Sequence, residues 1–77
     1  MSDAADRIKD VTARTLKVDL ARVTDESRFV EDLGAQSMQS IELIAAFEEE
    51  FDIEIDEEEA VTVKTVGKAV DYIVNLL

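Results

Sequence analysis

The centre of the chain contains the stretch Phe29-Val30-Glu31-Asp32-Leu33-Gly34-Ala35-Gln36-Ser37-Met38. Gly34 favours a turn, and Ser37 follows at a position where a helix begins. From there onward apolar residues recur at three- and four-residue spacing, which predicts a helix over residues 37–51. At about 100° of rotation per residue, one stripe of this helix faces the core. It consists of Ser40, Leu43, Ile44, Phe47 and Phe51.

The predicted helix 37–51 also has a second apolar lobe outside its core stripe. A helix that only had to be soluble would not need this lobe, so we interpret it as a docking surface, although single exposed apolar residues are common. The lobe consists of Met38, Ile41 and Ala45, and carboxylates of Glu42, Glu48 and Glu49 flank it.

The segments before this helix differ in regularity. Residues 3–16 have helical spacing, with Ser2 as the expected N-cap. Residues 17–36 show no sustained period. A connection of about 20 residues is long for a compact domain, so we expect it both to pack through its scattered apolar residues and to have a function.

The C-terminal part of the chain is partly ambiguous. Residues 51–66 alternate and are rich in β-branched side chains, which is typical of strands, but a single hairpin would be marginally stable. Within them, residues 56–60 resemble a short helical turn. Residues 65–77 are predicted to form the last helix, with Thr65 as its N-cap.

Length and composition exclude several classes of protein. A chain of 77 residues is interpreted as one domain, residues 1–77. Because it has no Cys and no His, it cannot form Ser-His-Asp or Cys-His catalytic groups or thiolate and imidazole metal sites. No apolar run approaches the ~20 residues of a membrane span, and the acidic start is unlike a signal peptide. We therefore expect a soluble, cytoplasmic and monomeric protein.

The net charge of −11 comes from one segment. Residues 31–59 contain twelve acidic residues and no Lys or Arg. This charge repels phosphate backbones, so nucleic-acid binding is disfavoured. The segment also has enough apolar residues to fold, which excludes a disordered tail. Two interpretations remain open: a solvated face, or a face that docks on a basic partner.

Ser37 has two possible roles. It could be the N-cap of helix 37–51, with its hydroxyl accepting a backbone N–H. It could instead be an exposed hydroxyl that another enzyme modifies, and a phosphodiester there would be stabilised by the helix dipole. Without a neighbouring His or Lys it is not an activated nucleophile. From these considerations alone, the N-cap is the better interpretation.

The motif resembles that of the acyl carrier protein family, and the resemblance extends over essentially the whole chain. The family pattern of Phe, two residues, Asp-Leu-Gly, one residue and Asp-Ser-Leu is met at Phe29, Asp32, Leu33, Gly34 and Ser37. The resemblance implies an all-α fold: a small four-helix bundle with a long first loop and a short third helix. Residues 51–66 would then be a loop and the short third helix.

The resemblance also implies a function. Ser37 would carry a 4′-phosphopantetheine arm, attached by a phosphopantetheinyl transferase, and the arm's thiol would hold acyl groups as thioesters. The protein would be a non-catalytic carrier that visits acyl-transfer and chain-elongation enzymes through their basic patches. The expected recognition residues are Gln36, Met38, Gln39, Ile41, Glu42, Ala45, Glu48, Glu49 and Glu57. The expected acyl-chain pocket consists of Leu43, Ile44, Phe47, Ile55, Ala60, Val63, Ala69 and Tyr72.

The sequence departs from the family pattern beside the attachment point. Gln36 replaces the usual Asp, Met38 replaces Leu, and Gln39 replaces an acidic residue. Two carboxylates are therefore missing beside the attachment point, although the downstream glutamates remain. The resemblance implies that the Asp replaced by Gln36 helps recognition by the transferase. Three functions remain open: a carrier for fatty-acid, polyketide or related lipid synthesis, a carrier for an aminoacyl or other specialised cargo, and an acidic interaction module without a prosthetic group.

Overall fold

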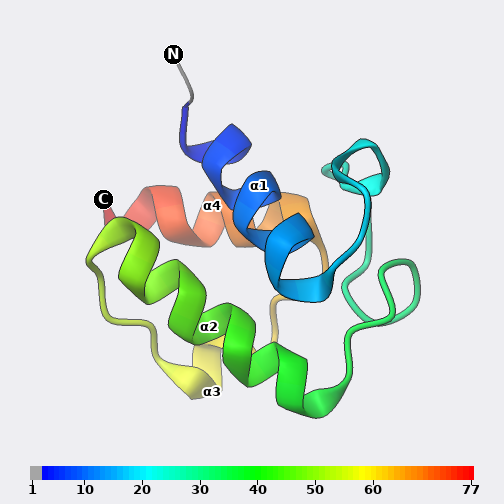
Figure 1. Ribbon diagram of the computed structural model, residues 1–77. Coiled ribbons are helices and arrows are strands. Elements are labelled where there is room, and N and C mark those ends of the chain that lie inside the picture. The colour runs from blue at the N-terminus through cyan, green and yellow to red at the C-terminus, as the bar shows by residue number, and fades with distance from the viewer. Residues whose placement is uncertain (1–2) are drawn as a thin grey trace.

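The computed structural model describes residues 3–77 as a small helical bundle (Figure 1). Its elements are α1 (Ala4–Leu16), the 3₁₀ turn η1 (Leu20–Arg22), α2 (Ser37–Phe51), α3 (Glu57–Ala60) and α4 (Val66–Leu76). Within these residues there is no strand, only an isolated antiparallel bridge between Arg28 and Thr65. The prediction of an all-α four-helix bundle with a long first loop and a short third helix is confirmed.

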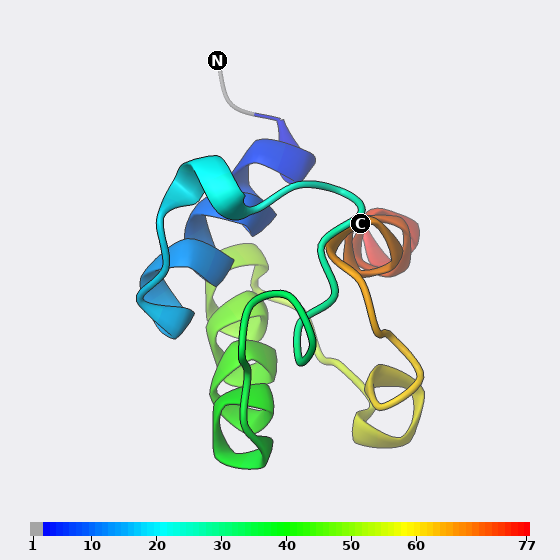
Figure 2. The ribbon, with the colours of Figure 1, turned by 90° about the vertical axis from the view of Figure 1, so that its right-hand side faces the viewer.

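Helix α1 is the element against which both α2 and α4 pack. In Figure 2, α2 runs down the view and α4 is seen end-on, so these two helices cross rather than lie parallel. The most deeply buried side chains are Ile8 and Thr12 of α1 and Val66 and Ile73 of α4. The hydroxyl of Thr12 donates a 2.8 Å hydrogen bond to the carbonyl of Ile8, so its burial leaves no unpaired polar group.

The N-caps of α1 and α4 are both side chains that accept a backbone N–H of the first helical turn. The N-cap of α1 is Asp3, whose carboxylate accepts the N–H of Asp6 at 2.9 Å. The predicted cap, Ser2, lies outside the described residues. The predicted cap of α4 is confirmed, because the Thr65 hydroxyl accepts the N–H of Lys68 at 3.2 Å.

The long loop before α2 is held by backbone hydrogen bonds to the beginning of α4. The carbonyls of Asp25 and Ser27 accept the N–H groups of Gly67 and Val66 at 2.8 and 2.9 Å. These N–H groups belong to the first turn of α4, which has no partners of its own for them. The loop therefore stabilises the start of α4, and α4 fixes the loop that leads to α2.

Residues 51–66 do not form the hairpin that their alternation allowed. After α2 ends, Ile53 and Ile55 are half-buried and pack against the core from a loop. The carboxylate of Asp56 then accepts the N–H of Glu58 at 2.9 Å and begins the short helix α3. The alternating pattern thus reflects a loop with one side against the core, which has the same period as a strand.

We expect Gly67→Ala to lower the free energy of unfolding by about 1–3 kcal/mol. A Cβ at this position would lie 2.9 Å from the carbonyl oxygen of Asp25, a backbone atom that cannot swing aside. The clash outweighs the gain of about 1 kcal/mol in helix propensity. Urea denaturation followed by circular dichroism measures the change. A variant as stable as the native chain would show that the loop does not need this close approach.

Candidate functional site

Ser37 is the first residue of α2 and is exposed to solvent. The N-cap of the helix is Gln36, so the prediction that Ser37 is the cap is wrong. The side chain of Gln39 accounts for the difference, because its Oε1 accepts the N–H of Gln36 at 3.0 Å and stabilises Gln36 as the cap. No hydrogen bond involves the Ser37 hydroxyl within residues 3–77, which leaves it available for modification.

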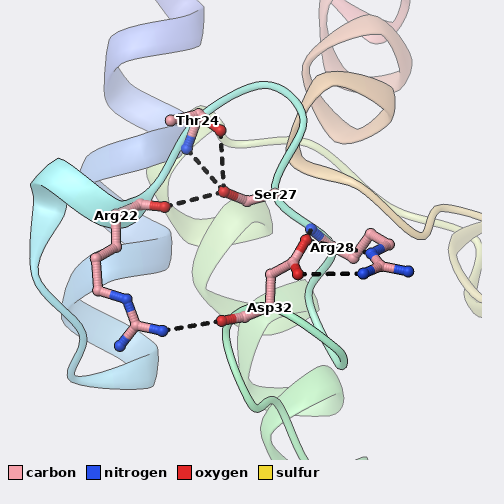
Figure 3. Close-up of polar contacts among 5 residues, drawn as sticks. All are labelled: Arg22, Thr24, Ser27, Arg28 and Asp32. Atoms are coloured by element: carbon pink, nitrogen blue, oxygen red, sulfur yellow. Dashed lines mark hydrogen bonds and ion pairs between the residues drawn. The ribbon is translucent and has the colours of Figure 1, made fainter.

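The turn before Ser37 is fixed by its own hydrogen bonds. The carboxylate of Asp32 accepts the backbone N–H of Arg28 at 2.8 Å and its guanidinium Nε at 3.2 Å (Figure 3). These contacts, first the side-chain bond and then the backbone bond, lower the pKa of Asp32. Gly34 follows with φ +72°, a left-handed conformation that glycine adopts without strain. Asp32 therefore shapes the turn that presents Ser37.

A second set of bonds joins this turn to the beginning of the long loop. The guanidinium of Arg22 donates to the carbonyl of Asp32 at 3.1 Å. The hydroxyl of Ser27 donates to the Arg22 carbonyl at 2.9 Å and accepts the Thr24 N–H at 3.0 Å (Figure 3). Sequence reasoning missed this network, because scattered polar residues in a loop have no period that would indicate their partners.

The second apolar lobe of α2 lies on the surface as predicted. Met38 is 73% exposed and Ile41 is 63% exposed, and Ala45 is exposed beside them. The structure places the other expected recognition residues in two groups. Gln36, Glu42, Glu49 and Glu57 are exposed, whereas Gln39 and Glu48 are half-buried.

Glu48 differs from the other carboxylates of the expected recognition set. Its Oε2 accepts the backbone N–H of Ile55 at 2.9 Å, which ties the loop after α2 back onto the helix. A carboxylate with an internal partner has less to gain from an external one. Among the carboxylates on α2, Glu42 and Glu49 are therefore better placed to meet a partner.

The end of α2 is joined to α1 by charged side chains. The Arg7 guanidinium donates to the Glu50 carboxylate at 2.9 Å and to the Glu50 carbonyl at 2.7 Å, and it lies 4.4 Å from the ring centroid of Phe51. Arg14 contacts the same carboxylate at 3.9 Å. Glu50 therefore belongs to the packing of α1 against α2.

The acidic surplus remains largely unneutralised. Of the twelve acids in residues 31–59, only Asp32 and Glu50 form ion pairs in the described part of the chain, which leaves ten without one. Like charges gathered on one part of a small domain repel one another and destabilise the compact state.

We expect added salt to raise the melting temperature. Between 0.01 and 0.15 M, the screening length falls from about 30 to about 8 Å, which weakens repulsion among the ten unpaired carboxylates. A gain of about 1 kcal/mol corresponds to an increase of about 4–8 °C in Tm for a domain of this size. Thermal denaturation at several concentrations of NaCl and MgCl₂ measures it. A flat or falling Tm would show that salt weakens stabilising ion pairs within the chain at least as much as it weakens the repulsion.

Six of the eight expected acyl-chain pocket residues belong to the core or pack against it: Leu43, Phe47, Ile55, Val63, Ala69 and Tyr72. Leu43, Phe47 and Ala69 are buried, and Ile44, Ile55, Ala60, Val63 and Tyr72 are half-buried. None of the eight pocket residues lines either of two surface hollows. One hollow lies beside α4, around Asp25 and Lys68, and the other lies beside α1, around Arg7 and Leu20. In this structure the six named first are packed as core.

Residues 3–77 contain no cluster of metal-ligating side chains that could hold an ion. No helix among them is long and apolar enough to cross a membrane.

Comparisons with known proteins agree with this geometry. A family model described as "Phosphopantetheine attachment site" matches residues 6–73. A solved structure of a Mycobacterium tuberculosis chain assigned as an acyl carrier protein superimposes with a TM-score of 0.90 at 31% sequence identity. The match covers 97% of this chain and 100% of the Mycobacterium chain.

Proposed function

The chain belongs to the acyl carrier protein family and is a phosphopantetheine carrier, and from that premise we propose that it shuttles acyl groups between enzymes of fatty-acid, polyketide or related lipid synthesis. We place the 4′-phosphopantetheine group on Ser37. The observation that supports this most strongly is that Ser37, the first residue of α2, is exposed and that its hydroxyl has no hydrogen bond to another residue of the range 3–77. In this proposal the protein is a substrate of other enzymes and not itself a catalyst.

The residues around Ser37 fit a covalently attached phosphodiester. The first turn of α2 contains no acidic residue, so no carboxylate repels the phosphate there. The unpaired N–H groups of that turn and the helix dipole favour an anion. When bound, the group supplies the thiol that holds the acyl chain as a thioester, which a chain without Cys cannot supply itself.

The exposed face of α2 supports docking on partner enzymes. Met38 and Ile41 offer apolar contact near Ser37, and Glu42 and Glu49 offer negative charge along the same helix. This combination suits a partner with an apolar entrance to its active site and a basic patch beside it. Such partners would include the phosphopantetheinyl transferase and acyl-transfer and chain-elongation enzymes. The interior side chains named above would shelter the acyl chain between visits.

The absence of carboxylates at Gln36 and Gln39 bears on which transferase loads the chain. The Gln39 side chain accepts the backbone N–H of Gln36 at 3.0 Å, and because both residues are uncharged, this end of α2 is neutral. A transferase that recognises an acid before the serine would lose that contact. We propose that the chain is loaded by a transferase matched to it and serves one dedicated pathway.

Intact mass spectrometry tests the proposed function. The chain is incubated with coenzyme A and several phosphopantetheinyl transferases, one of them of broad specificity. A gain of one phosphopantetheine supports the carrier. No gain with any of the transferases would contradict it and favour an acidic interaction module. Loading by only some of them would identify the transferase preference that Gln36 implies.

A further inference from the structure

One side-chain hydrogen bond joins α3 to α4. The hydroxyl of Tyr72 in α4 donates to Oε1 of Glu59 in α3 at 2.8 Å. The other hydrogen bonds of α3 are local: Asp56 caps its beginning, and Thr62 donates to the carbonyl of Glu59 at 2.7 Å at its end. Within residues 3–77, the Tyr72 bond is therefore the only hydrogen bond that attaches α3 to another helix.

Helix α3 depends on contacts of this kind for its position. It has four residues and buries none of them. A helix so short is unstable by itself in water, so packing and the bonds at its ends must hold it. The half-buried side chains of Ile55 and Val63 flank α3 and pack against the core together with Tyr72. Because Ile55 and Val63 lie just before and just after α3 in the chain, moving α3 away would pull these side chains off the core.

We infer that the Glu59–Tyr72 hydrogen bond is a latch that holds α3 to α4 and keeps Ile55 and Val63 packed on the core, and that it controls whether an apolar cargo can reach these two side chains. The part of this inference that concerns cargo rests on the proposed function. The latch itself does not, because it can be tested on the chain without any arm.

The ionisation of Tyr72 provides a direct probe of the latch. Burial raises the pKa of Tyr72, and the hydrogen bond that its hydroxyl donates to the Glu59 carboxylate raises the pKa further. The charge of Asp56 acts in the same direction, while its backbone N–H opposes it. Tyr72 is the only tyrosine and there is no tryptophan, so ultraviolet absorbance during a pH titration reports on this residue alone.

The first experiment compares Glu59→Gln with Glu58→Gln in the unmodified chain. Both variants remove one negative charge from α3, but Glu58 has no side-chain partner within residues 3–77. We expect the pKa of Tyr72 to fall in Glu59→Gln and to change much less in Glu58→Gln. Equal falls would show that general charge and not the hydrogen bond controls Tyr72, and would overturn the latch.

The second experiment measures hydrogen exchange in Tyr72→Phe. Removing this hydrogen bond should speed exchange of the Ala60 and Val61 amides by about threefold to tenfold. Amides in the middle of α1 should keep their rates if the effect is local. Unchanged rates in α3 would contradict the latch, and so would an equal increase in α1, which would indicate general loss of stability.

The third experiment tests the role of the latch toward cargo. The arm-bearing chain is loaded with an eight-carbon acyl chain or, as a control, with an acetyl group. The longer chain should speed exchange of the α3 amides in the native sequence, and less so in Tyr72→Phe, where the latch is already absent. If α3 responds equally to both groups, the latch does not control cargo. If no arm can be attached, the proposed function fails while the first two results still stand.

Discussion

Ser37→Ala is expected to abolish attachment of phosphopantetheine completely while leaving the fold intact. The substitution removes the hydroxyl oxygen that would form the phosphodiester. It should change the free energy of unfolding by no more than about 0.5 kcal/mol, because the exposed side chain has no hydrogen bond to lose among the described residues and alanine is a good helix former. Intact mass after incubation with coenzyme A and the transferase measures attachment, and urea denaturation measures stability.

Ser40→Ala is the matched control for this experiment. Ser40 lies in the same helix three residues further on, and its hydroxyl donates a long bond of 3.4 Å to the Gln36 carbonyl. The Ser40→Ala variant should accept the arm on Ser37 as the native chain does. A mass gain that persists in Ser37→Ala, or that disappears in Ser40→Ala, would show that the attachment site is misplaced.

Helix α2 shows what local sequence pattern can predict. Its predicted range, 37–51, is the observed one. Apolar residues recur at helical spacing along this whole segment, and this pattern outweighs the preference of single residues for other structures. The exposed lobe of Met38 and Ile41 was predictable for the same reason: once the core stripe is known, the helix period determines which residues face solvent.

The contacts that the sequence did not reveal join residues far apart in the chain. Arg7 reaches the carbonyl of Glu50 at the end of α2, and Tyr72 reaches Glu59. Neither pair has a local signature, because each depends on how α1 and α4 lie against the rest of the bundle. Glu50 therefore looked like another free carboxylate in an acidic run, although it is paired with Arg7.

The helix start at the candidate site was predicted to the residue, but its cap was not. Serine is the commoner N-cap, so intrinsic preference favoured Ser37 over Gln36. The observed start depends on the Gln39 side chain, which folds back onto the Gln36 N–H. A pair of glutamines three residues apart is a weak signal by itself. Its consequence is functional, since a cap at Gln36 leaves the Ser37 hydroxyl free.

Glu49→Lys is expected to slow association with the transferase by about threefold to tenfold at low salt, with kcat little changed. Glu42→Lys should behave similarly. Both carboxylates are exposed on α2 and have no ion pair in the described part of the chain, so nothing internal is lost when they are replaced. Reversing a charge at the rim of an interface changes the rate of encounter more than the chemical step. Stopped-flow or surface-binding kinetics measure the association rate across a range of salt concentrations.

Two further substitutions separate the docking face from other effects of charge. Glu26→Lys changes the net charge of −11 by the same two units, but Glu26 is exposed in the loop before α2. Glu50→Lys lies on α2, but it should act mainly by destabilising the fold, because Glu50 pairs with Arg7 and Arg14.

If the acidic segment docks through one face, only Glu42→Lys and Glu49→Lys will slow association while preserving Tm. If Glu26→Lys slows association as much, the partner responds to the overall charge of the chain and the face on α2 is misassigned. An association rate that is insensitive to salt in the native chain would exclude electrostatic docking altogether, because salt screens the attraction between exposed charges on two proteins.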